Sequence, residues 1–326
     1  MTVRLTLADV EQARAALAPH LAPTPLRPSL AAPGAGLYLK LECWQPTGSF
    51  KVRGAIHVLS SLTGEERQRG VVAASAGNHA LGVAFAAERL AGTIPATLFL
   101  PRTAPLTKLQ KLARFPVEIR QVGDSYDDTV DAAHDFERRT GAVFVHAYED
   151  TRTAAGQGTV ALEILEQCPD LGTVLVPVGG GGLLAGVATV LAALAPRVRV
   201  IAVQPDASPA LRESVRLGTA LLTYPARPTL ADGLAGGVGQ IALDHMDLVD
   251  EIVEVSEREI EDAIVAILAA DQVVVEASGA VGVAALRSGR LRDAARGPIV
   301  AILTGGNIDA TVLARLLATR LDEARS

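Results

Sequence analysis

The chain of 326 residues has little cysteine and no concentrated positive charge. Cys43 and Cys168 form neither a CxxC pair nor a disulfide framework, so we expect a protein of a reducing cytoplasm. Its 30 basic and 36 acidic residues give a net charge of −6 without any basic run, which argues against a nucleic-acid partner. The start MTVRLTLADVEQARAAL has no signal-peptide core and predicts a capped helix with Asp9 near its beginning.

Long apolar runs are also missing, apart from residues 171–196, which carry no charge. Their length alone would allow a membrane span. However, Pro177 and the glycines of 179–182 interrupt the run. We therefore predict a strand at 173–178, a glycine loop at 179–182 and a helix at 183–195, and no association with a membrane.

Lysine is scarce, since only four of the 30 basic residues are lysines. Lys40 alternates with leucines in LYLKLE, which predicts an outward side chain on a strand. Lys108 and Lys111 lie three apart in a helical pattern and predict an exposed basic face. Trp44 could trim a binding pocket or pack in the core, and the core is the favoured interpretation.

Lys51 differs from the other lysines because turn residues frame it in LECWQPTGSFKVRGA, residues 41–55. A helix that begins at Gly48-Ser49 would place this amine in its first turn, at the positive end of the helix dipole. Nearby positive charge lowers the pKa of an amine, as a nucleophilic, Schiff-base lysine requires. The alternative is an ordinary solvated lysine at a helix end.

Short apolar runs alternate with helical patterns along the chain, which is typical of parallel α/β layers. Hydrophobic residues make up 49% of the chain and aromatic residues 3%, enough for a large core. The strands are predicted at 37–42, 71–75, 96–100, 117–122, 142–146, 173–178, 198–203, 249–254 and 298–303. The helices include 50–62, 78–91, 105–114, 125–140, 153–167, 183–195, 256–270 and 309–321.

Three glycine-containing corners follow predicted strands: VVAASAGNHALG (71–82), VPVGGGGLLAG (176–186) and AILTGGNID (301–309). The carboxyl ends of parallel strands are where α/β proteins bind ligands. Ser75 and Asn78 add polar side chains to a helix start that could bind an anion, although a tight turn with an Asn cap explains that corner equally well. Thr304 ends the third strand, where a plain turn is the alternative.

The second corner has four successive glycines, which let backbone N–H groups approach a phosphate closely. It is neither a P-loop nor a G-x-G-x-x-G fingerprint, and Gln204 stands where a ribose-binding acid is expected. A nicotinamide site is therefore the weaker alternative. A poised lysine, a phosphate cradle, an anion site and a polar strand end together match the groups of pyridoxal 5'-phosphate.

Seven stretches in order along the chain carry a resemblance: PTGSFKVRGA, SAGNHALG, AGQGTVALE, PVGGGGLLAG, LADGLA, EASGAVGVAAL and LTGGNID. They resemble the fold-type II pyridoxal-phosphate enzymes, in the threonine/serine dehydratase (ammonia-lyase) and serine racemase branch. The resemblance implies two open, twisted, mainly parallel sheets flanked by helices, as in the tryptophan synthase β-like fold. It also implies a large cofactor-binding domain, 1–57 and 147–326, and an inserted small domain, 58–146, that carries the asparagine loop.

The resemblance also implies roles for individual residues. Lys51 would be the catalytic Schiff-base lysine, and the substrate carboxylate would lie against Ser75, Ala76, Asn78 and His79. The cofactor would contact Phe50, Lys51, Asn78, Gly179, Gly180, Gly181, Gly182, Leu183, Glu276 and Thr304, with Asn78 at the ring 3'-oxygen, the glycines and Leu183 at the phosphate and Thr304 at the ring nitrogen. No metal site is expected, because Gln204, Ser208 and Ala210 stand where some relatives bind a divalent cation.

The activity implied is β-elimination from a small β-hydroxy amino acid such as L-threonine or L-serine, which gives a 2-oxo acid and ammonia. A serine racemase or another β-replacement enzyme is the alternative, and a non-catalytic ligand-binding protein is a third. Serine racemases of this branch carry a hydroxyl where this chain has Ala76, which argues against racemisation. Serine, threonine, 3-hydroxyaspartate and bulkier substrates all stay open, and we expect a homodimer or homotetramer.

Overall fold

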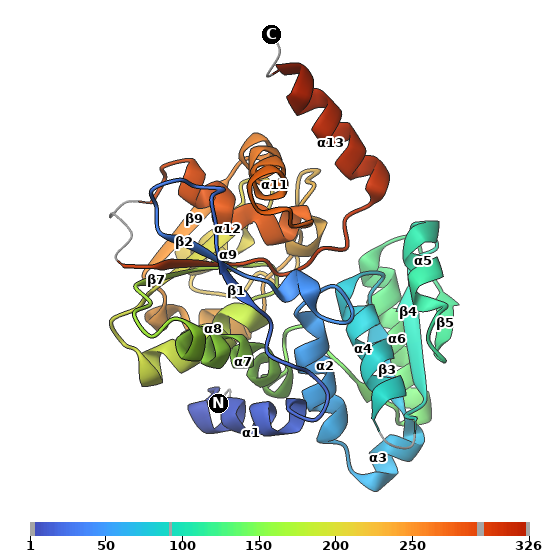
Figure 1. Cartoon of the computed structure of the whole chain (residues 1–326). Helices are drawn as coiled ribbons and strands as arrows, with labels where there is room; N and C mark the ends of the chain where they lie inside the picture. The colour runs from blue at the N-terminus through green and yellow to red at the C-terminus, as the bar shows by residue number, and fades with distance from the viewer. Residues whose placement is uncertain (1–3, 91–92, 292–296, 324–326) are drawn as a thin grey trace.

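The computed structural model describes residues 4–90, 93–291 and 297–323, which form two sheets covered by helices (Figure 1). The larger sheet has the order β1-β2-β10-β7-β8-β9, and the smaller has the order β5-β4-β3-β6. β1 pairs antiparallel with β2, and all other pairs are parallel. The strands are β1 (Leu26–Pro28), β2 (Leu37–Lys40), β3 (Val71–Ala74), β4 (Ala96–Leu100), β5 (Glu118–Gln121), β6 (Val143–Phe144), β7 (Thr173–Pro177), β8 (Arg199–Pro205), β9 (Glu251–Val255) and β10 (Ile299–Ile302).

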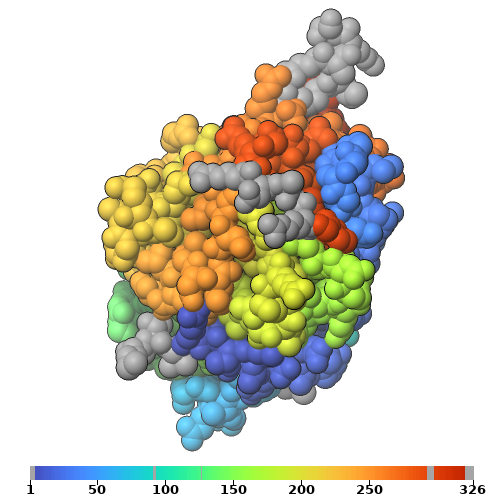
Figure 2. All heavy atoms as spheres, turned by 90° about the vertical axis from the view of Figure 1, so that its left-hand side faces the viewer, coloured from blue at the N-terminus to red at the C-terminus, as the bar shows by residue number. Residues whose placement is uncertain are grey.

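Helices cover both faces of the six-stranded sheet, because its central strands carry apolar side chains on both faces. Val174 and Val176 of β7 pack in one core cluster, and Leu175 packs in the cluster on the opposite face. The first face carries α1 (Leu7–Leu17), α7 (Thr151–Gln167) and α8 (Gly182–Leu194), and the second carries α11 (Glu257–Asp271), α12 (Ala277–Arg287) and α13 (Ala310–Glu323). In the space-filling view, the dark-blue residues at the start of the chain lie beside orange residues from around 250 (Figure 2), where Arg4 pairs with Asp247.

The four-stranded sheet is a separate layer with its own helices. α2 (Lys51–Ser60) and α4 (Asn78–Arg89) pack on one face, and α6 (Tyr126–Thr140) packs on the other. The remaining helices and 3-10 turns are α3 (Gly64–Arg69), α5 (Leu106–Leu112), α9 (Ala210–Leu217), α10 (Gln240–Leu243), η1 (Glu42–Trp44), η2 (Asp232–Leu234) and η3 (Met246–Leu248). The division of the chain into domains at 57/58 and 146/147 stays a prediction, and its first boundary falls within α2.

The structure contains all nine predicted strands, and to the expected strands and α-helices it adds β1, α3, α9, α10 and α12. The uncharged stretch 171–196 folds as β7, a glycine loop and α8, as predicted. Within the described residues, no helix is long and apolar enough to cross a membrane.

The predictions for the side chains of Lys40 and Trp44 are wrong. Lys40 was expected to point outward, yet its side chain is fully buried, because the alternate face of β2 lies under α7 rather than in water. Trp44 was expected in the core, yet half of it is exposed, because Glu42 and Cys43 form the buried side of η1.

Candidate active site

A cavity of about 620 Å³ lies between the two sheets. Three corners reach it: the residues after β3 from one sheet, and the residues after β7 and β10 from the other. Its wall contains all the residues that the sequence indicated for cofactor and substrate: Phe50, Lys51, Ser75, Ala76, Asn78, His79, Gly179, Gly180, Gly181, Gly182, Leu183, Glu276 and Thr304. The fold thus gathers segments more than 200 residues apart around one space.

Lys51 is the first residue of α2, and Phe50 is the N-cap. The backbone N–H of Phe50 donates to the carbonyl of Thr304 at 3.0 Å, which ties the start of this helix to the end of β10. The Lys51 Nζ donates to the carbonyl of Ala147 at 2.9 Å. Burial lowers the pKa of the amine to about 8. The direction is the one expected, but loss of hydration causes it rather than the helix dipole.

The glycine loop is built for close approach to a ligand. Gly181 has a φ of +94° and caps α8 without a side-chain hydrogen bond. A Cβ on Gly181 would overlap Ala242, and a Cβ on Gly180 would overlap the ring of Tyr148. The N–H groups at the start of a 13-residue helix therefore face the cavity without a capping side chain. Such a helix start attracts an anion the size of a phosphate.

The asparagine loop begins α4 in the same way, since its N-cap Gly77 provides no side-chain cap. The Ser75 Oγ accepts from the N–H of Gly77 at 3.2 Å. His79 is buried, and its Nε2 donates to the carbonyl of Val145 at 2.8 Å. Burial, together with the nearby charge of Lys51, lowers the pKa of His79 to about 3, so this ring is neutral at pH 7.

Asn78 is held by a chain of hydrogen bonds across the cavity. Its Nδ2 donates to Glu276 Oε1 at 2.7 Å, and its Oδ1 accepts from Asn307 Nδ2 at 2.8 Å. Lys111 Nζ in turn donates to Asn307 Oδ1 at 3.0 Å. Burial raises the pKa of Glu276 to about 7. This chain of hydrogen bonds joins α4 and α5 to the start of α12 and to the segment that follows β10.

Lys108 and Lys111 were predicted to form an exposed basic face, and that prediction is wrong. Both line the cavity. Lys108 pairs with Asp232 at 3.1 Å, so α5 contacts the LADGLA stretch across the opening. The helical spacing correctly places both lysines on one face, but that face borders the cavity and leaves both side chains only partly exposed.

Ala147 and Tyr148 also line the cavity, and sequence reasoning missed them. Ala147 accepts from Lys51 through its backbone, and the ring of Tyr148 lies against the glycine loop. His146 supports the segment, because its Nδ1 accepts from the N–H of Glu149 at 2.8 Å. A backbone carbonyl that accepts a hydrogen bond leaves no signal in a sequence. The one sign that could have pointed to these residues is that they lie a few positions before the AGQGTVALE stretch.

Replacement of Glu276 by Gln should stabilise the cofactor-free protein above pH 7. The pKa of Glu276 is raised from an ordinary 4.5 to about 7, so between those values the folded state keeps a proton that the unfolded state has released. The contribution of this bound proton to the free energy of unfolding is complete below pH 4.5 and is lost as the pH rises through 7. The melting temperature of Glu276→Gln should exceed the wild-type value above pH 7, and the gap should close toward pH 4.5.

Thermal unfolding across this pH range measures the effect. Glu166→Gln is the matched control, because Glu166 is an exposed carboxylate on α7. A pH-independent difference for Glu276→Gln, or an equal gain in the control, would contradict the assignment.

The fold and the cavity define an α/β enzyme with a reactive lysine amine and a phosphate cradle. The family model described as pyridoxal-phosphate dependent enzyme matches residues 17–305. The chain belongs to this family and uses pyridoxal phosphate.

Named relatives support the dehydratase and racemase branch. The L-threonine ammonia-lyase of Thermotoga maritima is 43% identical over 96% of this chain and 78% of its own length. The catabolic L-threonine dehydratase of Escherichia coli strain K12 is 40% identical over 84% of this chain and 83% of its own length. The structure of maize serine racemase superposes with a TM-score of 0.90 at 33% identity, covering 99% of this chain and 100% of that one.

The residues present fit pyridoxal phosphate. The glycine loop packs too closely against Tyr148 and Ala242 to take a Cβ at Gly180 or Gly181, and the loop and the amine of Lys51 line the same cavity. Both features are what a phosphorylated aldehyde requires. Among the described residues, no group of three His, Cys, Asp or Glu side chains is placed to hold a metal ion.

Proposed function

We propose that this chain catalyses the pyridoxal-phosphate-dependent dehydration and deamination of a small β-hydroxy amino acid, with L-threonine as the first substrate to test. The observation that carries the proposal is the Lys51 amine, poised with a lowered pKa in the cavity that also holds the glycine loop. Relatives named L-threonine ammonia-lyase, 43% identical over most of the chain, support the substrate class.

The chain's own residues would divide the work between binding and proton transfer. The backbone N–H groups of 179–183 would bind the cofactor phosphate, and Asn78 and Thr304 would contact its ring. Ser75, Ala76, Asn78 and His79 would hold the substrate carboxylate at the start of α4. When bound, pyridoxal phosphate withdraws the electron pair that remains when the Cα–H bond breaks. Lys51, uncharged in a fraction of molecules near pH 8, would accept that proton at Nζ.

The reaction is tested by an assay of 2-oxo acid and ammonia across L-threonine, L-serine and 3-hydroxyaspartate. We expect L-threonine to give 2-oxobutyrate and ammonia in equal amounts. Colour from bound cofactor without release of a 2-oxo acid from any of these substrates would contradict the lyase proposal. A homodimer or homotetramer and a cytoplasmic location stay predictions, which sedimentation and fractionation would test.

Ala76 distinguishes elimination from racemisation. Inversion at Cα requires a proton donor on the face opposite Lys51, and Ala76 provides no hydroxyl beside Ser75 in the cavity wall. With L-serine, pyruvate should therefore form at least about tenfold faster than D-serine, as measured by chiral chromatography. Ala76→Ser should raise D-serine formation, whereas the control Ala76→Gly, which changes size without adding a hydroxyl, should not. Equal rates of pyruvate and D-serine formation in the unmodified enzyme would refute the prediction.

A further inference from the structure

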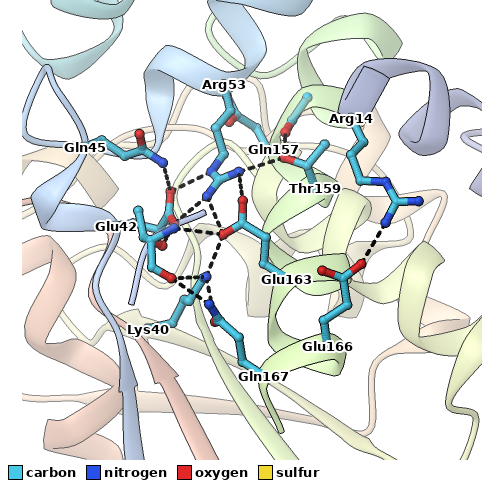
Figure 3. A network of polar contacts seen from close by, with 12 residues as sticks. Arg14, Lys40, Glu42, Gln45, Arg53, Gln157, Thr159, Glu163, Glu166 and Gln167 are labelled. Carbon is cyan, nitrogen blue, oxygen red and sulfur yellow. Dashed lines mark hydrogen bonds and ion pairs between the residues drawn. The ribbon is translucent and has the colours of Figure 1, made fainter. Parts of the chain in front are cut away.

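Three buried charged side chains and a nearly buried fourth form one network of polar contacts (Figure 3). Lys40 ends β2, Glu42 lies in η1, Arg53 lies in α2 and Glu163 lies in α7. The side chains of Lys40, Glu42 and Arg53 are at most 1% exposed, and that of Glu163 is 12% exposed. Two cations face two carboxylates, so the group is balanced in charge. Arg53 stands only two residues beyond Lys51 on the same helix.

Arg53 uses its complete set of five N–H donors. Toward Glu42, its Nε and Nη2 donate to the two carboxylate oxygens, both at 2.7 Å. Toward Glu163, its Nη1 and Nη2 donate at 2.7 and 2.9 Å. The remaining N–H of Nη1 donates to Thr159 Oγ1 at 3.0 Å. A planar guanidinium that is bidentate on both sides fixes the direction of the side chain as well as its position.

Lys40 completes the group with all three of its donors. Its Nζ donates to the carbonyl of Thr24 at 2.7 Å, to Glu163 Oε2 at 2.5 Å and to Gln167 Oε1 at 2.9 Å. Thr24 Oγ1 also donates to Glu42 at 2.5 Å. The network thus joins β2, η1, α2 and α7 into one rigid unit, with the hydrogen-bonding capacity of both cations fully used.

Stability alone is a poor reason to bury four charges. Desolvation of the charges offsets most of their attraction, and well-packed apolar side chains of similar volume often serve equally well. What apolar residues do not provide is the fixed geometry of a double fork. The network is therefore suited to hold α2 in one position relative to α7.

The position of α2 relative to α7 matters because α2 carries Lys51, whereas α7 holds in place the segment whose carbonyl binds the Lys51 amine. Thr153 Oγ1, in the first turn of α7, donates to the carbonyl of His146 at 3.0 Å, which fixes the segment that contains Ala147. The two helices also touch at Gly54 and Gly156, where a Cβ on Gly156 would lie 2.6 Å from the Cα of Gly54. A small shift of α2 along α7 would therefore displace the Lys51 amine from Ala147.

We infer that Arg53 is a positioning residue for Lys51, which holds the first turn of α2 against α7 and so keeps the amine at the carbonyl of Ala147. Its kinetic consequence rests on the proposed function, but the placement of the amine does not. The network is part of the active site's support, although Arg53 does not line the cavity.

Arg53→Lys tests this role, because it keeps the charge but removes the fork and two donors. We expect the cofactor-loaded variant to show a kcat for the 2-oxo acid reaction that is about 10- to 100-fold lower, with KM changed by less than about threefold. The visible circular dichroism of the bound cofactor should also weaken. Glu163→Gln, which breaks one side of the fork, should shift both measurements in the same direction, and it serves as the second variant if Arg53→Lys does not fold.

A second readout needs no catalysis. The chain has four lysines, so wild-type protein labelled with ¹³C at the lysine ε-carbon gives four signals, which single Lys→Arg variants assign. In Arg53→Lys and in Arg14→Lys the introduced lysine adds a fifth signal, and a Lys51→Arg change made in each of these variants identifies the Lys51 signal. In the cofactor-free chain, the Lys51 signal should titrate near pH 8. In Arg53→Lys, its midpoint should rise by about half a pH unit or more as water reaches the loosened amine.

Arg14→Lys is the matched control, since Arg14 pairs with Glu166 on α7 at 2.8 Å with both side chains exposed. It should leave kcat, the cofactor spectrum and the Lys51 titration unchanged. A purely structural role for Arg53 predicts a lower melting temperature with kcat, dichroism and Lys51 midpoint all as in wild type, and that result would overturn the inference. If no variant and no wild-type protein releases a 2-oxo acid, the proposed function fails, but the Lys51 titration still decides the role of Arg53.

Discussion

Lys51→Ala is expected to lower kcat by about 10³- to 10⁴-fold, while the variant still binds pyridoxal phosphate. The proposed catalysis needs an amine that releases its proton readily, and burial lowers the pKa of Lys51 to about 8. The glycine loop that is proposed to bind the phosphate lies between β7 and α8 and does not depend on the lysine side chain. Steady-state 2-oxo acid release and cofactor absorbance, measured on the same sample, separate the two effects.

Lys51→Arg is the control for charge, because a guanidinium keeps the cation at the start of α2 but does not act as a base or form an imine at neutral pH. It should be as inactive as the alanine variant. Borohydride reduction of the loaded wild type, followed by peptide mapping, should place the pyridoxyl group on Lys51. Finding the label on Lys40, Lys108 or Lys111 would show that the reactive lysine has been misassigned.

Gly181→Ala should weaken the binding of pyridoxal phosphate by about 100-fold. Gly181 has a φ of +94°, which an alanine adopts at a cost of about 1–2 kcal/mol. A methyl group there would also overlap the Cβ of Ala242 and push the loop out of its shape. Because the loop's N–H groups bind the phosphate only in that shape, the loss should appear in cofactor affinity, as measured by absorbance titration of the cofactor-free protein.

Gly218→Ala separates backbone strain from steric overlap. Gly218 caps α9 with a φ of +69°, and a Cβ there would meet nothing within 4 Å. This control should lower the melting temperature slightly and leave cofactor affinity unchanged. Equal affinity in Gly181→Ala and wild type would show that the loop does not carry the phosphate.

The parts of the site that the sequence predicted well are those encoded in short segments. A strand followed by glycines and a helix predicts a ligand-facing corner, and Gly179–Gly182 and the Ser75–His79 stretch both reach the cavity. Local order suffices there because consecutive residues build the whole corner. The same local rule explains why the helix that begins at Lys51 was expected within a residue or two of its actual start.

The predictions that failed depend on distant segments. Lys40 alternates with leucines, and alternation predicts a solvent-exposed face only when no other element covers that face. Here α7, more than 100 residues away, covers it and supplies Glu163 and Gln167 as partners. Likewise, the Ala147 carbonyl is a partner of Lys51 only because α2 lies beside the segment that follows β6, 96 residues further along the chain. The low pKa of Lys51 was predicted, but its cause, burial in the folded chain, is a tertiary property.

Amine-reactive reagents should modify few lysines on the outer surface of this protein. Lys40 is sealed in the core, and Lys51, Lys108 and Lys111 all border the cavity, so no lysine side chain stands on the outer surface away from it. Lysine-directed crosslinkers and ester dyes should therefore meet few reactive lysine side chains outside the cavity, and reagents directed at carboxylates or arginines will suit crosslinking better. Conversely, a small acylating reagent that does react should enter the cavity, and its rate with and without bound cofactor becomes a direct assay of cavity occupancy.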